Sequence, residues 1–138
     1  DDRKMLLARA IQLFMPGKPQ VWYLDLFVGK NDYAAMERAG KDGHKEINRT
    51  NLSPADVEAG LKKQVVLDQL ELLRLRNTQK VFSADAAISA ETDGSRLRLT
   101  WRTAQEIACL DADLESFGFA VTVSDNASGK ETYRFTQA

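Results

Sequence analysis

The stretch VWYLDL, residues 21–26, decides the fold class, because it is short, aromatic-rich and almost continuously apolar. This pattern is typical of a strand buried on both faces, as in a parallel sheet covered by helices. Asp25 interrupts the stretch, so we expect its carboxylate either to face a polar site or to be paired inside the protein. The sequence therefore predicts a buried strand from Val21 to Leu26.

A helix is predicted on each side of this strand. Residues Arg3 to Phe14 are apolar around most of a helical circumference, and the sequence PGKP at 16–19 ends that helix. The sequence SPAD at 53–56 has residues favoured at a helix start, and the second helix should run to about Arg76. Helix, turn and buried strand form half of a β/α unit, so residues 1–78 are predicted to be α/β.

The remainder of the chain changes character and predicts a small antiparallel all-β domain over residues 79–138. Strict alternation of apolar and polar residues marks a strand at Arg96–Arg102, and further strands are expected at 105–110, 119–123 and 132–136. Residues 81–82 and 86–90 are candidates for one or two more. Hairpin turn signals lie at 92–95 and 126–129. The boundary between the two parts is expected near residues 77–81.

The composition of the chain limits the kinds of binding partner and the cellular compartment that we expect for it. The 138 residues include 19 basic and 20 acidic ones, so a net charge of -1 gives no electrostatic argument for nucleic acid or an anionic membrane as a partner. The single cysteine, Cys109, excludes an internal disulfide and favours a reducing, cytoplasmic location. A buried structural thiol is its more common role. One His and one Cys at distant positions make no metal site.

The polar stretch from Phe27 to Ser53 is the first candidate for a functional site, because loops that follow the strands of a β/α barrel build its active-site face. Its Lys, His and Arg residues could bind hydroxyls, phosphate or carboxylate, although a solvated polar loop is the more common interpretation of such a composition. The aromatic residues Trp22, Tyr23 and Phe27 either stack on a sugar or lie in the core, and core is the more common role at strand spacing.

Three segments carry a resemblance to a known family. The sequence ARAIQLFMPGKPQVWY, residues 8–23, resembles the passage from the last helix to the eighth strand in the barrel of the α-amylase superfamily. The sequences GKND at 29–32 and GHKEINR at 43–49 are similar to the sucrose phosphorylase subfamily. Those phosphorylases carry an Arg where this chain has Lys45, with His44 as an apparent insertion. The longer run GHKEINRTNLS at 43–53 looks closest to the glucosylglycerate phosphorylase branch.

The resemblance implies that residues 1–78 are the last helix, strand and helix of a TIM-type (β/α)8 catalytic barrel, followed by an all-β C-terminal domain. It implies a retaining glycoside phosphorylase that transfers glucose between an α-glucoside, of glucosylglycerate or sucrose type, and phosphate, without a cofactor. The catalytic Asp and Glu of such enzymes lie on earlier barrel strands, so no catalytic residue is expected in this chain. Lys45 is the first candidate for an acceptor or phosphate contact, followed by His44 and Arg49. Arg49 has an equal alternative role, holding the loop by an ion pair.

Two other functions stay open at this stage. One is an amylase-type α-glucoside hydrolase, and the other is a non-catalytic module with no activity of its own. We also expect this chain to be part of a longer protein, inactive by itself. The predicted helix at Arg3–Phe14 is apolar on more than one side and needs further surface to pack against, so the chain is expected to self-associate.

Overall fold

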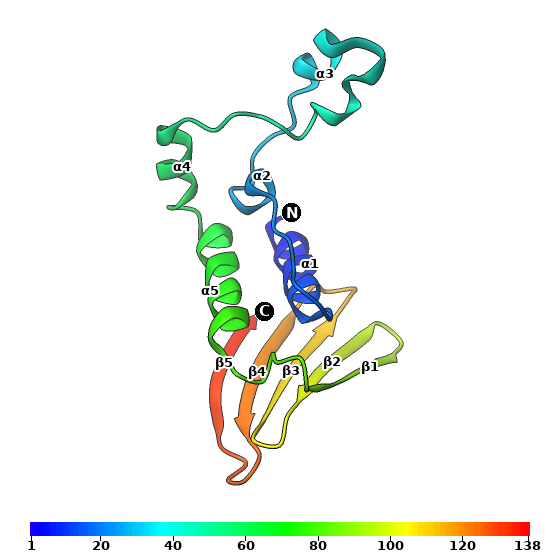
Figure 1. Cartoon of the computed structure of the whole chain (residues 1–138), viewed down its shortest axis with the longest axis vertical. Coiled ribbons are helices and arrows are strands. Elements are labelled where there is room, and N and C mark those ends of the chain that lie inside the picture. The colour runs from blue at the N-terminus through cyan, green and yellow to red at the C-terminus, as the bar shows by residue number, and fades with distance from the viewer. The chain divides into compact units, whose positions relative to one another are not determined.

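A computed structural model describes all 138 residues, and they form two compact units. One unit joins Asp1–Pro19 with Gln69–Ala138, and the other is Gln20–Asp68. Figure 1 shows that the helices come first along the chain and that the strands occupy its second half. No helix has both the length and the apolar character needed to cross a membrane.

The first unit is built on a five-stranded antiparallel sheet whose strands follow one another in sequence order (Figure 1). Its strands are β1 (Ala87–Asp93), β2 (Arg96–Arg102), β3 (Glu106–Asp113), β4 (Phe119–Asp125) and β5 (Glu131–Gln137). Two of the hairpin turns contain a glycine in the left-handed region, Gly94 with φ 56° and Gly129 with φ 68°, where other residues would be strained. The antiparallel sheet predicted for this half is confirmed, but residues 81–82 lie in a turn and add no strand.

One face of this sheet forms the core of the unit, because every second side chain of the central strands points to the same side. Leu99 and Trp101 of β2 are buried there, and so are Ala108 and Leu110 of β3. Helix α1 (Asp2–Phe14) contacts these two strands with its apolar residues. The helix begins where the Asp1 carboxylate accepts hydrogen bonds from two backbone N–H groups of the first turn, and it ends at Phe14, two residues before Pro16.

Polar contacts connect this core to α5 (Gln64–Thr78). The buried Arg9 donates from Nε to Gln69 Oε1 at 2.9 Å, which joins α1 to α5. In β5, at one edge of the sheet, Tyr133 Oη donates to Glu71 Oε1 of α5 at 3.1 Å. The guanidinium of Arg76 lies 4.7 Å and 4.3 Å from the ring centres of Phe82 and Trp101, close enough for cation–π attraction. The second half of α5 is thereby fixed within the same unit as the sheet.

The strand predicted at Val21–Leu26 is wrong, because the structure has a short helix, α2 (Tyr23–Leu26), at this position. Trp22, directly before this helix, has an extended backbone. A strand needs a neighbour to satisfy its backbone groups, and the five-stranded sheet contains no parallel pair that could include this segment. The backbone instead bonds locally, with Leu26 N donating to Trp22 O at 3.0 Å and Phe27 N to Tyr23 O at 3.1 Å.

The single helix predicted from Ser53 to Arg76 is also wrong in one respect, since it is divided into α4 (Pro54–Gly60) and α5. The predicted start is confirmed as a capping box between Ser53 and Asp56. The division follows Gly60, where a side chain would meet the Phe27 ring at 2.7 Å. Tight backbone bonds then replace helical ones, as Lys63 N donates to Gly60 O at 2.9 Å. The barrel origin of this region and a domain boundary at 78/79 stay predictions.

Candidate functional site

The loop that carries the candidate residues begins with two short helical elements. Helix α3 (Tyr33–Ala39) starts where the Asp32 carboxylate accepts a hydrogen bond from Ala35 N at 2.8 Å. The 3₁₀-helix Gly40–Lys45 (η1) follows directly. Gly43 is buried between the two elements, where a Cβ would overlap the Met36 carbonyl oxygen and lie 2.9 Å from Ala39 Cβ. A glycine is therefore required immediately before His44.

The structure brings all three predicted site residues together around one hollow of about 330 Å³. It is lined by Trp22, His44, Lys45, Ile47, Asn48 and Arg49. The side chains of His44, Lys45 and Arg49 are all exposed, so a solute can reach them. A lysine, an arginine and an imidazole at one hollow favour an anionic or hydroxyl-rich ligand.

The ion-pair role considered for Arg49 is seen in the structure, while its role as a ligand contact stays a prediction. Its Nη1 lies 3.1 Å from Glu46 Oε1, while the side chain also lines the hollow. The two partners are 54% and 41% exposed, and an ion pair as open as this contributes only about 0–1 kcal/mol. An incoming anion can therefore compete with Glu46 for the guanidinium.

The loop around Arg49 is tied to the segment that contains α2. Four hydrogen bonds join the two: Trp22 Nε1 to Asn48 O at 2.8 Å, Tyr23 Oη to Thr50 O at 2.9 Å, Asp32 N to Ile47 O at 2.8 Å, and Thr50 Oγ1 to Lys30 O at 2.7 Å. Val28, two residues after the end of α2, has φ 54°, a left-handed conformation that a β-branched residue rarely adopts. Such strain persists only where the surrounding contacts fix the backbone.

The sequence-based assignment of Trp22 and Tyr23 to the core is wrong, because they are 45% and 36% exposed. A strand would have buried alternate side chains of this stretch, whereas the helical turn of α2 buries Leu24 and leaves its neighbours outside. Asp25 is exposed as well, so it is not a buried carboxylate. Trp22 instead lines the hollow, so the less common of the two roles considered for it, contact with a ligand, stays open.

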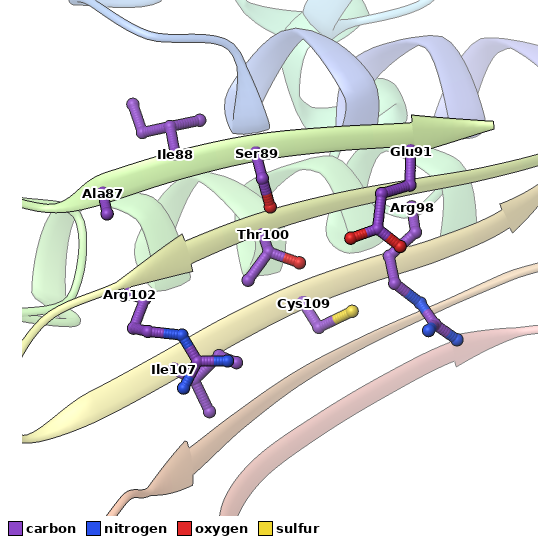
Figure 2. A pocket seen from close by; sticks show the side chains of 9 residues that line it. All are labelled: Ala87, Ile88, Ser89, Glu91, Arg98, Thr100, Arg102, Ile107 and Cys109. Carbon is purple, nitrogen blue, oxygen red and sulfur yellow. The ribbon is translucent and has the colours of Figure 1, made fainter.

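A second hollow, of about 340 Å³, lies on the polar face of the sheet, opposite the core (Figure 2). Ser89, Thr100 and Cys109 are paired across β1, β2 and β3, so they form one row at its floor. Figure 2 shows Arg98 and Glu91 on one side of this row and Arg102 on the other. Arg98 Nη2 lies 2.5 Å from Asp111 Oδ2, and the bond from Arg98 holds the pKa of Asp111 below its usual value.

The side chains at this second hollow are less suited to binding a ligand or reacting with it than those at the first. Asp111 also binds Arg96 at 2.8 Å, so one carboxylate already engages two of the sheet's guanidinium groups. Cys109 is half-buried on this face and not in the core, which corrects the predicted buried thiol. Burial raises the pKa of the thiol, and a protonated thiol is a poor nucleophile. The hollow beside Lys45 is therefore the better candidate for a binding site.

Comparison with known proteins identifies relatives that match most of this chain. No family model matches the chain. It is 59% identical over 121 residues to the sucrose 6(F)-phosphate phosphorylase of Ilumatobacter coccineus, covering 88% of this chain and 23% of that protein. It is 37% identical to the protein of the same name from Thermoanaerobacterium thermosaccharolyticum, over 95% of this chain and 26% of the relative. The chain thus spans about a quarter of the length of these curated relatives.

The fold agrees with the sequence comparison. A crystal structure of sucrose 6F-phosphate phosphorylase from Thermoanaerobacter thermosaccharolyticum matches with a TM-score of 0.84 and 34% identity, over 99% of this chain and 27% of the solved one. The glucosylglycerate branch, expected from residues 43–53 to be nearest, is more distant, since the glucosylglycerate phosphorylase of Escherichia coli is 27% identical over 78% of this chain. In sequence and in fold, the chain matches the sucrose phosphorylase family over about a quarter of a member's length.

Proposed function

We propose that this chain is part of a retaining glycoside phosphorylase that transfers glucose between an α-glucoside and phosphate. The observation that carries the proposal is the 59% identity to a protein named sucrose 6(F)-phosphate phosphorylase, which extends over 88% of the chain. Relatives named sucrose phosphorylase and glucosylglycerol phosphorylase, 35% and 32% identical, support the same reaction class with other glucosides. The proposed substrate is accordingly a sucrose-type glucoside with a phosphate on its fructose unit.

Within that reaction the proposed role of this chain is to bind the acceptor or phosphate. Lys45 supplies a compact ammonium donor to the anion. Arg49 supplies a guanidinium that leaves its ion pair with Glu46 and binds the anion instead. His44 adds a donor or acceptor at the same hollow. By the family resemblance, the nucleophile and the acid/base carboxylate lie on earlier strands of a (β/α)8 barrel, of which residues 1–78 would form the end. The role of this chain would then be to select the molecule that receives the glucosyl group. The glycosidic bond would be broken by the carboxylates on the earlier strands.

Phosphate dependence is the direct test of this function. The full-length protein is incubated with sucrose 6F-phosphate in the presence and absence of inorganic phosphate, and glucose 1-phosphate and free glucose are measured. We expect glucose 1-phosphate to form only with phosphate, faster than from unphosphorylated sucrose. Free glucose released at equal rates under both conditions would identify a hydrolase instead.

A substitution tests the proposed site separately from the reaction class. Lys45→Ala in the full-length protein should raise the KM for phosphate or acceptor by about tenfold or more, because a charge-assisted hydrogen bond contributes roughly 1.5–3 kcal/mol. Lys41→Ala is the matched control, since Lys41 is an exposed lysine of the same 3₁₀-helix that does not line the hollow. Equal kinetics of the two variants would remove Lys45 from the site.

A further inference from the structure

Side-chain hydrogen bonds from Trp22 and Tyr23 hold the backbone around Arg49 in the candidate site. The carbonyl before this residue, of Asn48, accepts a hydrogen bond from the indole N–H of Trp22 at 2.8 Å. The carbonyl after it, of Thr50, accepts one from the hydroxyl of Tyr23 at 2.9 Å. Two adjacent aromatic side chains therefore hold the backbone on both sides of the arginine.

We propose that Trp22 and Tyr23 are positioning residues of the ligand-binding loop: they fix the backbone of Asn48–Thr50 and thereby set the affinity of the hollow for the anion bound by its cations. This inference rests on the proposed function for the identity of that anion, a phosphate group. It assigns a role to two side chains that neither the family resemblance nor the apolar pattern of the sequence identified.

The geometry favours positioning over ordinary packing. Both rings are substantially exposed, at 45% and 36%, so little of their surface contributes to a core. Their polar atoms, by contrast, are both used, and both are used on the same three-residue stretch. The rings also contact each other, with centres 5.0 Å apart, so each limits the movement of the other.

The two bonds also restrict the backbone of a loop that has little regular structure. Binding by a mobile loop loses affinity to the cost of ordering it, and a loop held in the binding arrangement avoids that cost. Two further hydrogen bonds hold this part of the loop, from Asp32 N to Ile47 O and from Thr50 Oγ1 to Lys30 O. Loss of one side-chain bond should therefore loosen the loop without unfolding it.

Tyr23→Phe is the sharpest test, because it removes one hydroxyl from a side chain that does not itself line the hollow. In the full-length enzyme we expect the KM for phosphate to rise about threefold to tenfold, the range for one lost hydrogen bond, with kcat changed less than twofold. Trp22→Phe should act in the same direction. Tyr33→Phe is the control, as Tyr33 belongs to the same unit, is 60% exposed and makes no hydrogen bond through its hydroxyl.

A double variant separates positioning from general damage. If Tyr23 acts through the loop around Arg49, then Tyr23→Phe should raise KM much less in an Arg49→Gln background than alone. Additive effects of the two substitutions would contradict the proposal. So would a lowered Tm with KM and kcat unchanged, because that result would assign Tyr23 a structural role only.

Hydrogen exchange tests whether the two aromatic side chains hold the loop, and this test does not depend on an activity measurement. The amides of Glu46 and Arg49, both bonded within the loop, should exchange faster in Tyr23→Phe and Trp22→Phe than in Tyr33→Phe. If the unmodified enzyme shows no phosphate-dependent cleavage, the proposed function fails, and unchanged exchange would then overturn the positioning role as well. If phosphorolysis occurs but Tyr23→Phe leaves KM unaltered, the function stands and this inference falls.

Discussion

Trp101 donates a hydrogen bond from its indole Nε1 to the carbonyl oxygen of Phe14 at 2.7 Å, joining β2 to the last residue of α1. Both side chains are buried, and Phe82 contacts each of them edge-on, with ring centres 5.3 Å from Phe14 and 5.5 Å from Trp101. The carbonyl at a helix end has no partner within the helix, so the indole satisfies a group that would otherwise be buried alone. This bond fixes where α1 ends against the sheet.

Trp101→Phe should therefore destabilise the chain by about 2–4 kcal/mol, since it leaves a buried carbonyl without its donor and removes buried surface. Urea unfolding followed by circular dichroism measures the change. Trp22→Phe is the matched control, because that indole is 45% exposed and its loss should cost far less stability. Equal losses in the two variants would contradict the structural role given to Trp101.

The contact between Tyr133 and Glu71 predicts a loss of stability at alkaline pH. Burial, with the hydrogen bond to Glu71, raises the pKa of the Tyr133 hydroxyl well above its usual range. Up to about pH 10 both the folded and the unfolded chain keep this proton, so the contribution to stability is complete. Above that pH the unfolded chain releases the proton first, and the free energy of unfolding must fall as pH rises.

Chemical denaturation at pH 7 to 11 checks this dependence. Tyr133→Phe should cost about 1 kcal/mol at pH 7 and should reduce the decline above pH 10. Tyr33→Phe, at an exposed tyrosine whose hydroxyl makes no hydrogen bond, should leave the decline as it is. A decline of the same steepness in Tyr133→Phe would assign the effect to other groups.

The close packing around Gly43 predicts that a change there affects both the stability of the loop and ligand binding at the candidate site. Its Cβ position is occupied by the backbone of Met36 and the side chain of Ala39, so Gly43→Ala must push η1 away from α3. Overpacking of this kind costs about 1–3 kcal/mol, and the shift moves His44 and Lys45, the next two residues. We expect a lower Tm together with a raised KM for phosphate in the full-length protein.

Gly118→Ala is the control for that substitution, because the nearest atom to its Cβ position is Ser116 Oγ at 3.4 Å. This is an ordinary contact distance, and Tm should change little. A Gly43→Ala variant with unchanged Tm and KM would show that the loop adapts to the methyl group and that its arrangement does not govern binding.

The predicted self-association of the 138-residue chain is testable in solution. Leu61 and Leu67, near the junction of α4 and α5, are each 43% exposed, and exposed apolar surface favours association. Sedimentation velocity should show a mass that increases with concentration, and Leu61→Lys with Leu67→Lys should lower it. Leu114→Lys, on the other unit and 42% exposed in the unmodified chain, is the control. A monomer at every concentration would contradict the prediction.

Local signals in the sequence were sufficient for several elements. The alternation in residues 96–102 predicted β2 with its bounds, because a strand places alternate residues on opposite faces whatever surrounds it. The capping box of Ser53 and Asp56 likewise predicted the start of α4, since its bonds lie within four residues of sequence. The loop residues His44, Lys45 and Arg49 were proposed as site residues from the resemblance of residues 43–49 to the sucrose phosphorylase subfamily, and their role stays a prediction.

Short-range patterns were enough to show which segments alternate, where α4 begins and which family the loop resembles, because these properties depend on neighbouring residues. The helix at residues 23–26 depends on the rest of the fold, since a strand there needs a partner that short-range patterns cannot supply. The tertiary structure also decided that Trp22 and Tyr23 face outward and bond Asn48 and Thr50, more than twenty residues away. An apolar side chain is buried only where the fold provides a place for it, and no local pattern specifies that place.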